Sequence, residues 1–268
     1  EMLELNKIYN MDCIEGMKLI PDNSIDLIVT SPPYDEIRDY KGFSLDLHNV
    51  GIEISRILKD GGICVMIIQD QTKNGRKTGT SFRTIVDWID NTELDLWECC
   101  IYYRSGTPGA WWNKRFRVDH EYIPIFLKGK RPQYFNKEHM MISPKKEGIQ
   151  KSGGSRLTNG IVSKGFISTG KPKCCGTIIK YASSSQEGNG LCSKESHKIK
   201  LQHPATFPDK LASDFIQCFT KEGMIVLDPF IGSGTVAAMA KKLNRNYIGF
   251  EISKEYCDIA EQRLKLLI

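Results

Sequence analysis

Long apolar runs are missing from this sequence. Among its 268 residues, no stretch approaches the ~18 consecutive apolar residues that a membrane-spanning helix needs. The first residues, EMLELNKIYN, lack the basic-then-apolar order of a secretory signal. We therefore expect a cytoplasmic protein without a membrane partner.

Cysteine is present, but its spacing indicates neither a disulfide framework nor a metal site. The nine cysteines are scattered along the chain, which fits a reducing compartment. Cys174 and Cys175 are adjacent, whereas zinc knuckles separate paired cysteines by about two to four residues. We therefore expect no bound metal.

The chain does contain the alternation of strands and helices that is typical of an α/β fold. Residues 24–30 and 61–70 are short runs rich in Ile and Val, which predict strands buried on both faces. Between them, residues 45–62 have apolar positions at helical spacing and end in a Gly-Gly pair, which predicts a helix stop. We expect a mostly parallel, doubly wound sheet.

The same alternation returns near the end of the sequence, after a region of different composition. We expect helices and strands in turn at residues 203–223, 224–230, 232–244, 246–253 and 254–268. Residues 129–200 are instead rich in turn signals such as SGGS and STGKPK. This division predicts one domain made of residues 1–128 and 201–268, with an irregular insert at 129–200.

Positive charge is concentrated in that middle region. From Lys128 to Lys200 there are 15 Lys or Arg residues and 4 Asp or Glu residues, although the whole chain has a net charge of only +5. The remainder of the chain is therefore net acidic. A basic segment on an acidic body indicates a polyanionic partner such as nucleic acid.

A glycine turn is the first of two short motifs that carry chemistry. In VLDPFIGSGT, Gly232 and Gly234 lie between an expected strand and helix, where glycine lets the backbone approach a ligand closely. Glu251 ends the next expected strand, where a carboxylate can accept hydrogen bonds from ribose hydroxyls. The dinucleotide fingerprint and the Walker lysine are both absent. A nucleoside cofactor without phosphates, S-adenosylmethionine, fits best.

The second motif is Ser-Pro-Pro-Tyr at residues 31–34, directly after an expected strand. An exocyclic base amine is a poor nucleophile because its lone pair is delocalised into the ring. The Ser31 hydroxyl and the Pro32 carbonyl can accept its two hydrogens and aim the lone pair at a methyl group. The prolines fix the turn, and Tyr34 can stack on a base flipped from the duplex.

Together, SPPY and DPFIGSGT resemble the catalytic and cofactor motifs of the DNA amino-methyltransferases. Their order, with the catalytic motif first, is that of the β class, a circularly permuted form of the methyltransferase fold. The resemblance covers most of residues 6–128 and 201–268. It implies that the insert at 129–200 is a target-recognition region.

The resemblance also implies residue roles at matching positions. It places base chemistry on Ser31, Pro32, Pro33 and Tyr34. It assigns cofactor binding to four segments: Asp12 and Cys13; His203, Pro204, Ala205, Thr206 and Phe207; Asp228, Phe230, Gly232, Ser233, Gly234 and Thr235; and Glu251.

Several alternatives remain open at this point. Ser at the first motif position favours cytosine N4 in the family, but adenine N6 presents the same two donors. No cysteine follows a proline, which argues against a cytosine C5 mechanism through a thiol. Two other functions remain as alternatives to a DNA amino-methyltransferase. One is a nucleic-acid-binding relative without catalysis, and the other is an RNA or protein methyltransferase. Double-stranded DNA is the expected partner; a cognate restriction endonuclease and a homodimer stay open.

Overall fold

The computed structural model describes residues 3–33, 45–105, 116, 118–142, 150–151, 161, 167–168, 173–182, 192–201 and 206–267. Contacts divide the chain into two compact units. The larger unit comprises Glu1–Asn136 and Thr177–Ile268, and the smaller unit is Lys137–Gly176.

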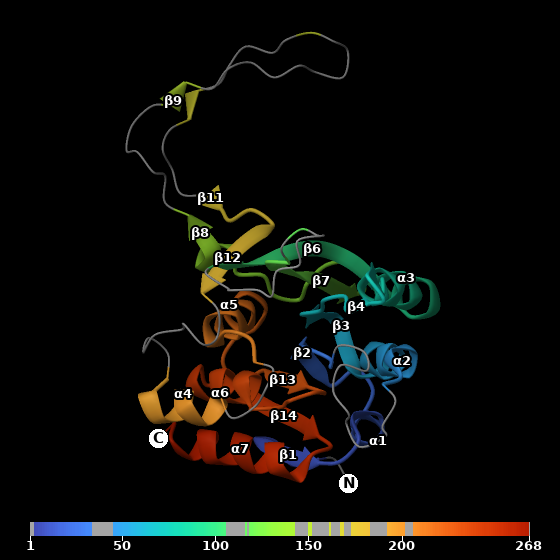
Figure 1. Ribbon diagram of the computed structural model, residues 1–268, viewed down its shortest axis with the longest axis vertical. Helices are drawn as coiled ribbons and strands as arrows, with labels where there is room; N and C mark the ends of the chain where they lie inside the picture. The colour runs from blue at the N-terminus through green and yellow to red at the C-terminus, as the bar shows by residue number, and fades with distance from the viewer. Residues whose placement is uncertain are drawn as a thin grey trace. The chain divides into compact units, whose positions relative to one another are not determined.

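An eight-stranded sheet forms the centre of the larger unit, in the order β1-β14-β13-β2-β3-β7-β6-β12 (Figure 1). Its strands are β1 (Lys7–Asn10), β2 (Ile25–Thr30), β3 (Leu58–Met66), β6 (Leu94–Ser105), β7 (His120–Lys128), β12 (Ile178–Ala182), β13 (Ile225–Asp228) and β14 (Asn246–Glu251). Every neighbouring pair is parallel except the two pairs that include β7. The sequence prediction of a mostly parallel α/β sheet is confirmed.

Helices cover the sheet on both faces. They are α1 (Cys13–Lys18), α2 (Leu47–Ile57), α3 (Thr80–Asn91), α4 (Lys194–Lys200), α5 (Asp209–Phe219), α6 (Thr235–Lys242) and α7 (Lys254–Lys265). The β2-α2-β3 and β13-α6-β14 crossovers run in opposite directions along the sheet, so right-handed connections place α2 and α6 on opposite faces. Helices α1, α2 and α3 pack in succession, and α5, α6 and α7 do the same (Figure 1).

Burial on both faces explains the continuous apolar strands. All six residues of β2, including Leu27, Ile28 and Val29, are buried. An apolar run without alternation is what a central parallel strand requires, because helices cover both of its sides. Within the described residues, no helix is long and apolar enough to cross a membrane.

Two boundaries differ from those expected from the sequence. Helix α2 ends at Ile57, and Gly61 and Gly62 lie within β3 because the strand already pairs at Leu58 with Ile25 of β2. Residues 177–200 belong with the larger unit, since β12 adds a parallel strand beside β6 and α4 packs on α7.

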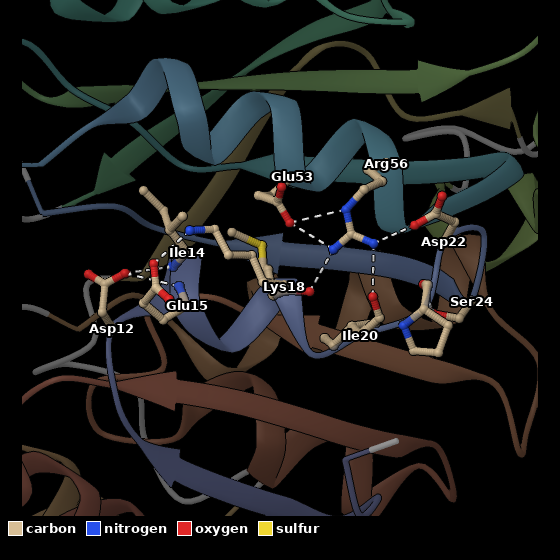
Figure 2. A network of polar contacts seen from close by, with 11 residues as sticks. Asp12, Ile14, Glu15, Lys18, Ile20, Asp22, Ser24, Glu53 and Arg56 are labelled. Carbon is tan, nitrogen blue, oxygen red and sulfur yellow. Dashed lines mark hydrogen bonds and ion pairs between the residues drawn. The ribbon is translucent and has the colours of Figure 1, made fainter. Parts of the chain in front are cut away.

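Side-chain hydrogen bonds fix both ends of α1 (Figure 2). Asp12 Oδ1 caps its start by accepting from the backbone N–H groups of Ile14 (2.8 Å) and Glu15 (3.2 Å). Arg56 of α2 donates to the carbonyls of Met17 (2.7 Å) and Ile20 (2.9 Å) at its end. These bonds hold α1 on α2 and fix the position of the β1–α1 junction.

The smaller unit has little regular structure in its described part. It contains a 3₁₀ helix, η2 (Lys137–Met140), and two short antiparallel ladders. These pair β8 (Met141–Ile142) with β11 (Lys173–Cys174) and β9 (Gln150–Lys151) with β10 (Ile167–Ser168).

Candidate functional site

The two motifs meet at the carboxyl edge of the sheet, between β13 and β2. Parallel strands β1, β14, β13 and β2 all end at this edge, and the chain leaves β13 and β2 in opposite directions. Such a topological switch point leaves a crevice between the diverging connections, where α/β proteins bind ligands. The sheet order therefore favours this edge as the candidate site.

A buried hydrogen bond joins the catalytic turn to the cofactor turn. Thr30, the last residue of β2, donates from Oγ1 to Asp228 Oδ1 over 2.7 Å. The same Asp228 oxygen accepts from the Phe230 backbone N–H at 3.0 Å. Ser31 follows Thr30 directly, so the contact fixes the start of Ser-Pro-Pro relative to the glycine turn.

Asp228 is fully buried, which makes the ionised form of its carboxyl less favourable. Burial raises the pKa of its carboxyl to about 7, although the hydrogen bonds from Thr30 and Phe230 oppose the shift; the charge of Glu251 adds to it. Asp228 is only 1% exposed and its side chain faces protein donors. Its geometry is that of a group that shapes the turn.

The glycine turn depends on two left-handed backbone positions. Gly232 has φ 48° and Gly234 has φ 76°, a region that side-chain-bearing residues rarely adopt. A Cβ on Gly234 would also lie 2.9 Å from the Ala260 side chain. The turn therefore requires glycine at Gly234 both for its backbone angle and for close packing on α7.

Glu251 lies at the end of β14, beside the glycine turn. Its Oε2 accepts from Gly232 N–H (3.1 Å) and its Oε1 from Ser253 N–H (2.9 Å). Each carboxylate oxygen can accept more than one hydrogen bond, so both retain capacity for a ligand hydroxyl. Burial raises the pKa of the Glu251 carboxyl, and backbone N–H donors, Ser253 first, partly offset that rise.

Asp12 and Cys13 reach the same edge through β1. The register pairs Asn10 of β1 with Glu251, two residues before Asp12. Burial, followed by the charge of Asp12 and a smaller effect of Glu251, raises the pKa of the Cys13 thiol to about 12. Cys13 is therefore a neutral, packed thiol at physiological pH.

Behind the turn lies an ion cluster that the sequence analysis did not identify. Arg263 of α7 donates to Thr235 Oγ1 (3.0 Å) and to Asp209 Oδ1 (2.5 Å), and Lys200 donates to the same Asp209 oxygen (2.8 Å). Burial alone would raise the pKa of Asp209, but the charges of Arg263 and Lys200 together lower it to about 2.

This cluster connects the glycine turn to both flanks of residues 201–208. Lys200 ends α4 and Asp209 begins α5, so Thr206 and Phe207 come just before a residue tied to the turn through Arg263. His203, Pro204, Ala205 and the predicted stacking residue Tyr34 lie outside the described residues. Ser31, Pro33, Asp12 and Phe230 are half-buried, and Pro32 and Ser233 are buried.

The missed residues had weak signals in the sequence. Thr30 belongs to an apolar strand and Arg263 to an ordinary amphipathic helix. Thr30, directly before Ser31, and Asp209, two residues after the expected cofactor segment, were near a motif. Their roles depend on contacts across the fold, such as the 198 residues that separate Thr30 from Asp228.

Comparison with known proteins agrees with this geometry. A family model described as DNA methylase, of the N6 and N4 type, matches residues 25–262. The chain is 37% identical over 258 residues to the orphan methyltransferase M.BamHII of Bacillus amyloliquefaciens, covering 92% of this chain and 91% of that protein. It is 30% identical over 278 residues to the type II methyltransferase M.BglII of Bacillus subtilis, covering 97% and 69%.

Solved structures show the same fold. The PvuII DNA methyltransferase, described as cytosine-N4-specific, superposes with a TM-score of 0.72 at 22% identity, covering 98% of this chain and 87% of that one. A complex of M1.HpyAVI with SAM gives a TM-score of 0.62 at 22% identity, covering 96% and 99%. With a family model over most of its length, the chain belongs to the DNA methylase family of N4 and N6 amino-methyltransferases.

Proposed function

We propose that this chain transfers a methyl group from S-adenosylmethionine to the N4 amino group of a flipped cytosine in double-stranded DNA. The observation that carries the proposal is the Thr30–Asp228 hydrogen bond of 2.7 Å. It sets Ser31, with its acceptor chemistry, beside a glycine turn suited to a nucleoside. Amino-group chemistry and cofactor chemistry thus share one edge of the sheet.

The residues at this edge fit S-adenosylmethionine. Gly232 and Gly234 place no side chain at two positions of the turn, and Glu251 offers buried carboxylate oxygens for ribose hydroxyls. No lysine lies in the turn sequence IGSGT to neutralise phosphates. When bound, the cofactor supplies an electrophilic methyl group on a sulfonium centre.

The chain's own residues then orient the target amine. In our proposal, the Ser31 hydroxyl and the Pro32 carbonyl accept the two amino hydrogens and turn the nitrogen lone pair partly out of conjugation with the ring. Pro33 limits the backbone so that these acceptors are held before the base arrives. Tyr34 stacks on the flipped base, which compensates for part of the lost stacking in the duplex.

Cytosine N4 is proposed over adenine N6 because Ser, rather than Asp, is the first motif residue. The described specificity of the PvuII enzyme, which shares the fold, agrees with this choice. The basic insert, residues 129–200, is proposed to contribute target recognition. We propose two further partners: a cognate restriction endonuclease and a second copy of this chain in a homodimer.

A nucleoside digest tests the target directly. Plasmid DNA from cells expressing the chain should contain 4-methylcytosine, and Ser31→Ala should lower single-turnover methyl transfer by about a hundredfold, the order found when one preorganised polar group is removed. Ser24→Ala, directly before the opposite end of β2, is the matched control, because within the described residues its hydroxyl donates to the Pro21 carbonyl. If the digest contains 6-methyladenine and no 4-methylcytosine, the target is adenine N6 and not cytosine N4. If the DNA carries neither modified base, the proposed methyltransferase activity is wrong.

A further inference from the structure

A short basic hairpin projects beyond β3 at the same edge as Ser31. Strands β4 (Thr72–Lys73) and β5 (Arg76–Lys77) pair antiparallel, and Asn74 and Gly75 form the turn with φ 48° and 74°. Two positive φ angles at Asn-Gly are typical of a tight hairpin turn. All six residues of the hairpin are exposed.

The charge of this segment contrasts with the sequence around it. Residues 71–86 contain four cations, Lys73, Arg76, Lys77 and Arg83, and no Asp or Glu. The chain outside the basic insert is otherwise net acidic. An acid-free, exposed basic segment in an acidic domain indicates a local anionic partner.

Two of the cations face each other directly. The register pairs Lys73 with Arg76, so both side chains project from the same face of the hairpin. Lys77 lies on the other face, where its Nζ donates to the Asp70 carbonyl over 3.0 Å.

Contacts at its base hold the hairpin in place. Thr78 N–H donates to the Gln71 carbonyl at 3.1 Å, and Arg83 of α3 donates to the Thr78 carbonyl. With the Lys77 contact, these bonds connect the hairpin to the end of β3 and to α3. A two-stranded hairpin is marginal by itself, so this anchoring is what keeps Lys73 and Arg76 in a defined place.

The hairpin is next to the catalytic turn in the sheet. Thr30 of β2 pairs with Met66 of β3, and Ile67 N–H donates to the Thr30 carbonyl at 2.8 Å. The chain therefore leaves β3 beside the end of β2 before it enters the hairpin. A duplex carries one phosphate charge per about 1.7 Å of its axis, so DNA that delivers a base to Ser31 brings phosphates to this edge.

We infer that the Lys73–Arg76 face of the hairpin binds backbone phosphates of the duplex beside the flipped base. This inference rests on the proposed function and adds a DNA contact outside residues 129–200. It assigns different roles to the hairpin cations: Lys73 and Arg76 contact DNA, and Lys77 anchors the hairpin to the domain. The phosphate contact positions the duplex and does not read its sequence.

A salt titration of duplex binding tests the inference. Lys73→Gln with Arg76→Gln should weaken duplex binding about tenfold or more near 0.1 M salt and reduce the slope of log affinity against log salt by about 1.8, since each lost phosphate contact contributes about 0.9. S-adenosylmethionine binding should not change. Lys73→Arg with Arg76→Lys should keep the wild-type slope.

The control removes two exposed cations from the opposite edge, Lys18→Gln with Lys221→Gln. It should bind and methylate DNA like the wild type. An unchanged slope in the hairpin variant, or an equal loss in the control, would overturn the inference while leaving the methyltransferase proposal intact. A wild-type chain that neither binds nor methylates duplex DNA would instead overturn the proposed function.

Discussion

The two edges of the central sheet hold their buried carboxylates in opposite ways. At the amino edge, where the parallel strands begin, Asp26 has a cation partner: its Oδ1 accepts from Lys59 Nζ at 2.6 Å and from Gln133 at 3.0 Å. Its Oδ2 accepts from the Ile225 N–H at 2.8 Å. Asp26 thus has three protein donors, one of them a cation, and supports the starts of β2 and β13.

At the carboxyl edge, Asp228 and Glu251 receive only hydroxyl and backbone N–H donors within the described part of the chain. Burial raises the pKa of both carboxyls. Without a cation, Glu251 remains a desolvated acceptor with capacity for further donors, whereas Asp228 is enclosed by the turn. Perturbed carboxyls of this kind concentrate at functional sites, where the unmet demand can be satisfied by a ligand.

One hollow in the surface of the protein lies away from the motif residues. A hollow of about 640 Å³ opens at the amino edge, lined by Asp60, Asp95, Trp97 and Lys128 among others. It contains none of the motif residues. Electrostatic demand and strand order favour the carboxyl edge as the candidate site, and this hollow lies away from it.

The largest expected difference between the edges concerns pH. The pKa of Asp228 is about 7 in the folded chain and about 3.9 when unfolded. Between these values the folded state binds more protons, so the free energy of unfolding should fall as pH rises from about 4 to about 7. Asp228→Asn should lack this trend, with a gain over the wild type near pH 7 on the order of a few kcal/mol.

Denaturant unfolding at several pH values between 4 and 7 measures this effect. The relevant quantity is the difference between variant and wild type, because groups that do not interact with Asp228 titrate equally in both. Asn at this position can still accept from Thr30 and Phe230 N–H. Parallel pH curves for the two proteins would show that Asp228 is not held at a raised pKa.

The second difference concerns the cofactor. Glu251→Ala removes two charge-assisted acceptors for ribose hydroxyls, each bond contributing about 1.5–3 kcal/mol. We expect S-adenosylmethionine to bind at least tenfold more weakly in calorimetry. Glu251→Gln is the companion variant, because it keeps the side-chain volume and should lie between Ala and wild type. Wild-type affinity in both would refute the ribose assignment.

Much of this arrangement could be predicted from the sequence. The apolar runs of β2, β3, β13 and β14 predicted strands, and the glycine turn and SPPY predicted where their ends carry chemistry. These signals are local, since burial on both faces and left-handed backbone angles restrict the residue types at each position.

The parts that could not be predicted depend on distant partners. Strand β12 was assigned to the insert because its short sequence gives no sign that it pairs with β6, about 80 residues earlier. Arg263 likewise gives no sequence signal of its bonds to Asp209 and Thr235. The β4–β5 hairpin contains an Asn-Gly turn signal, but its strands of two residues were too short to show alternation.

The smallest expected effect is on the free energy of unfolding, from a substitution at the amino edge. This substitution tests the contribution of the Asp26–Lys59 ion pair. Asp26→Asn keeps one acceptor oxygen but places an amide N–H where a donor approaches, and it removes the charge facing Lys59. Lys59 is 36% exposed, so water can replace part of the lost interaction. We expect the free energy of unfolding to fall by about 1 kcal/mol. Because Asp26 supports strand starts and contacts no motif residue, cofactor affinity per folded molecule should stay at the wild-type value. A loss of cofactor binding comparable to that of Glu251→Ala would mean that the two edges are not functionally separate.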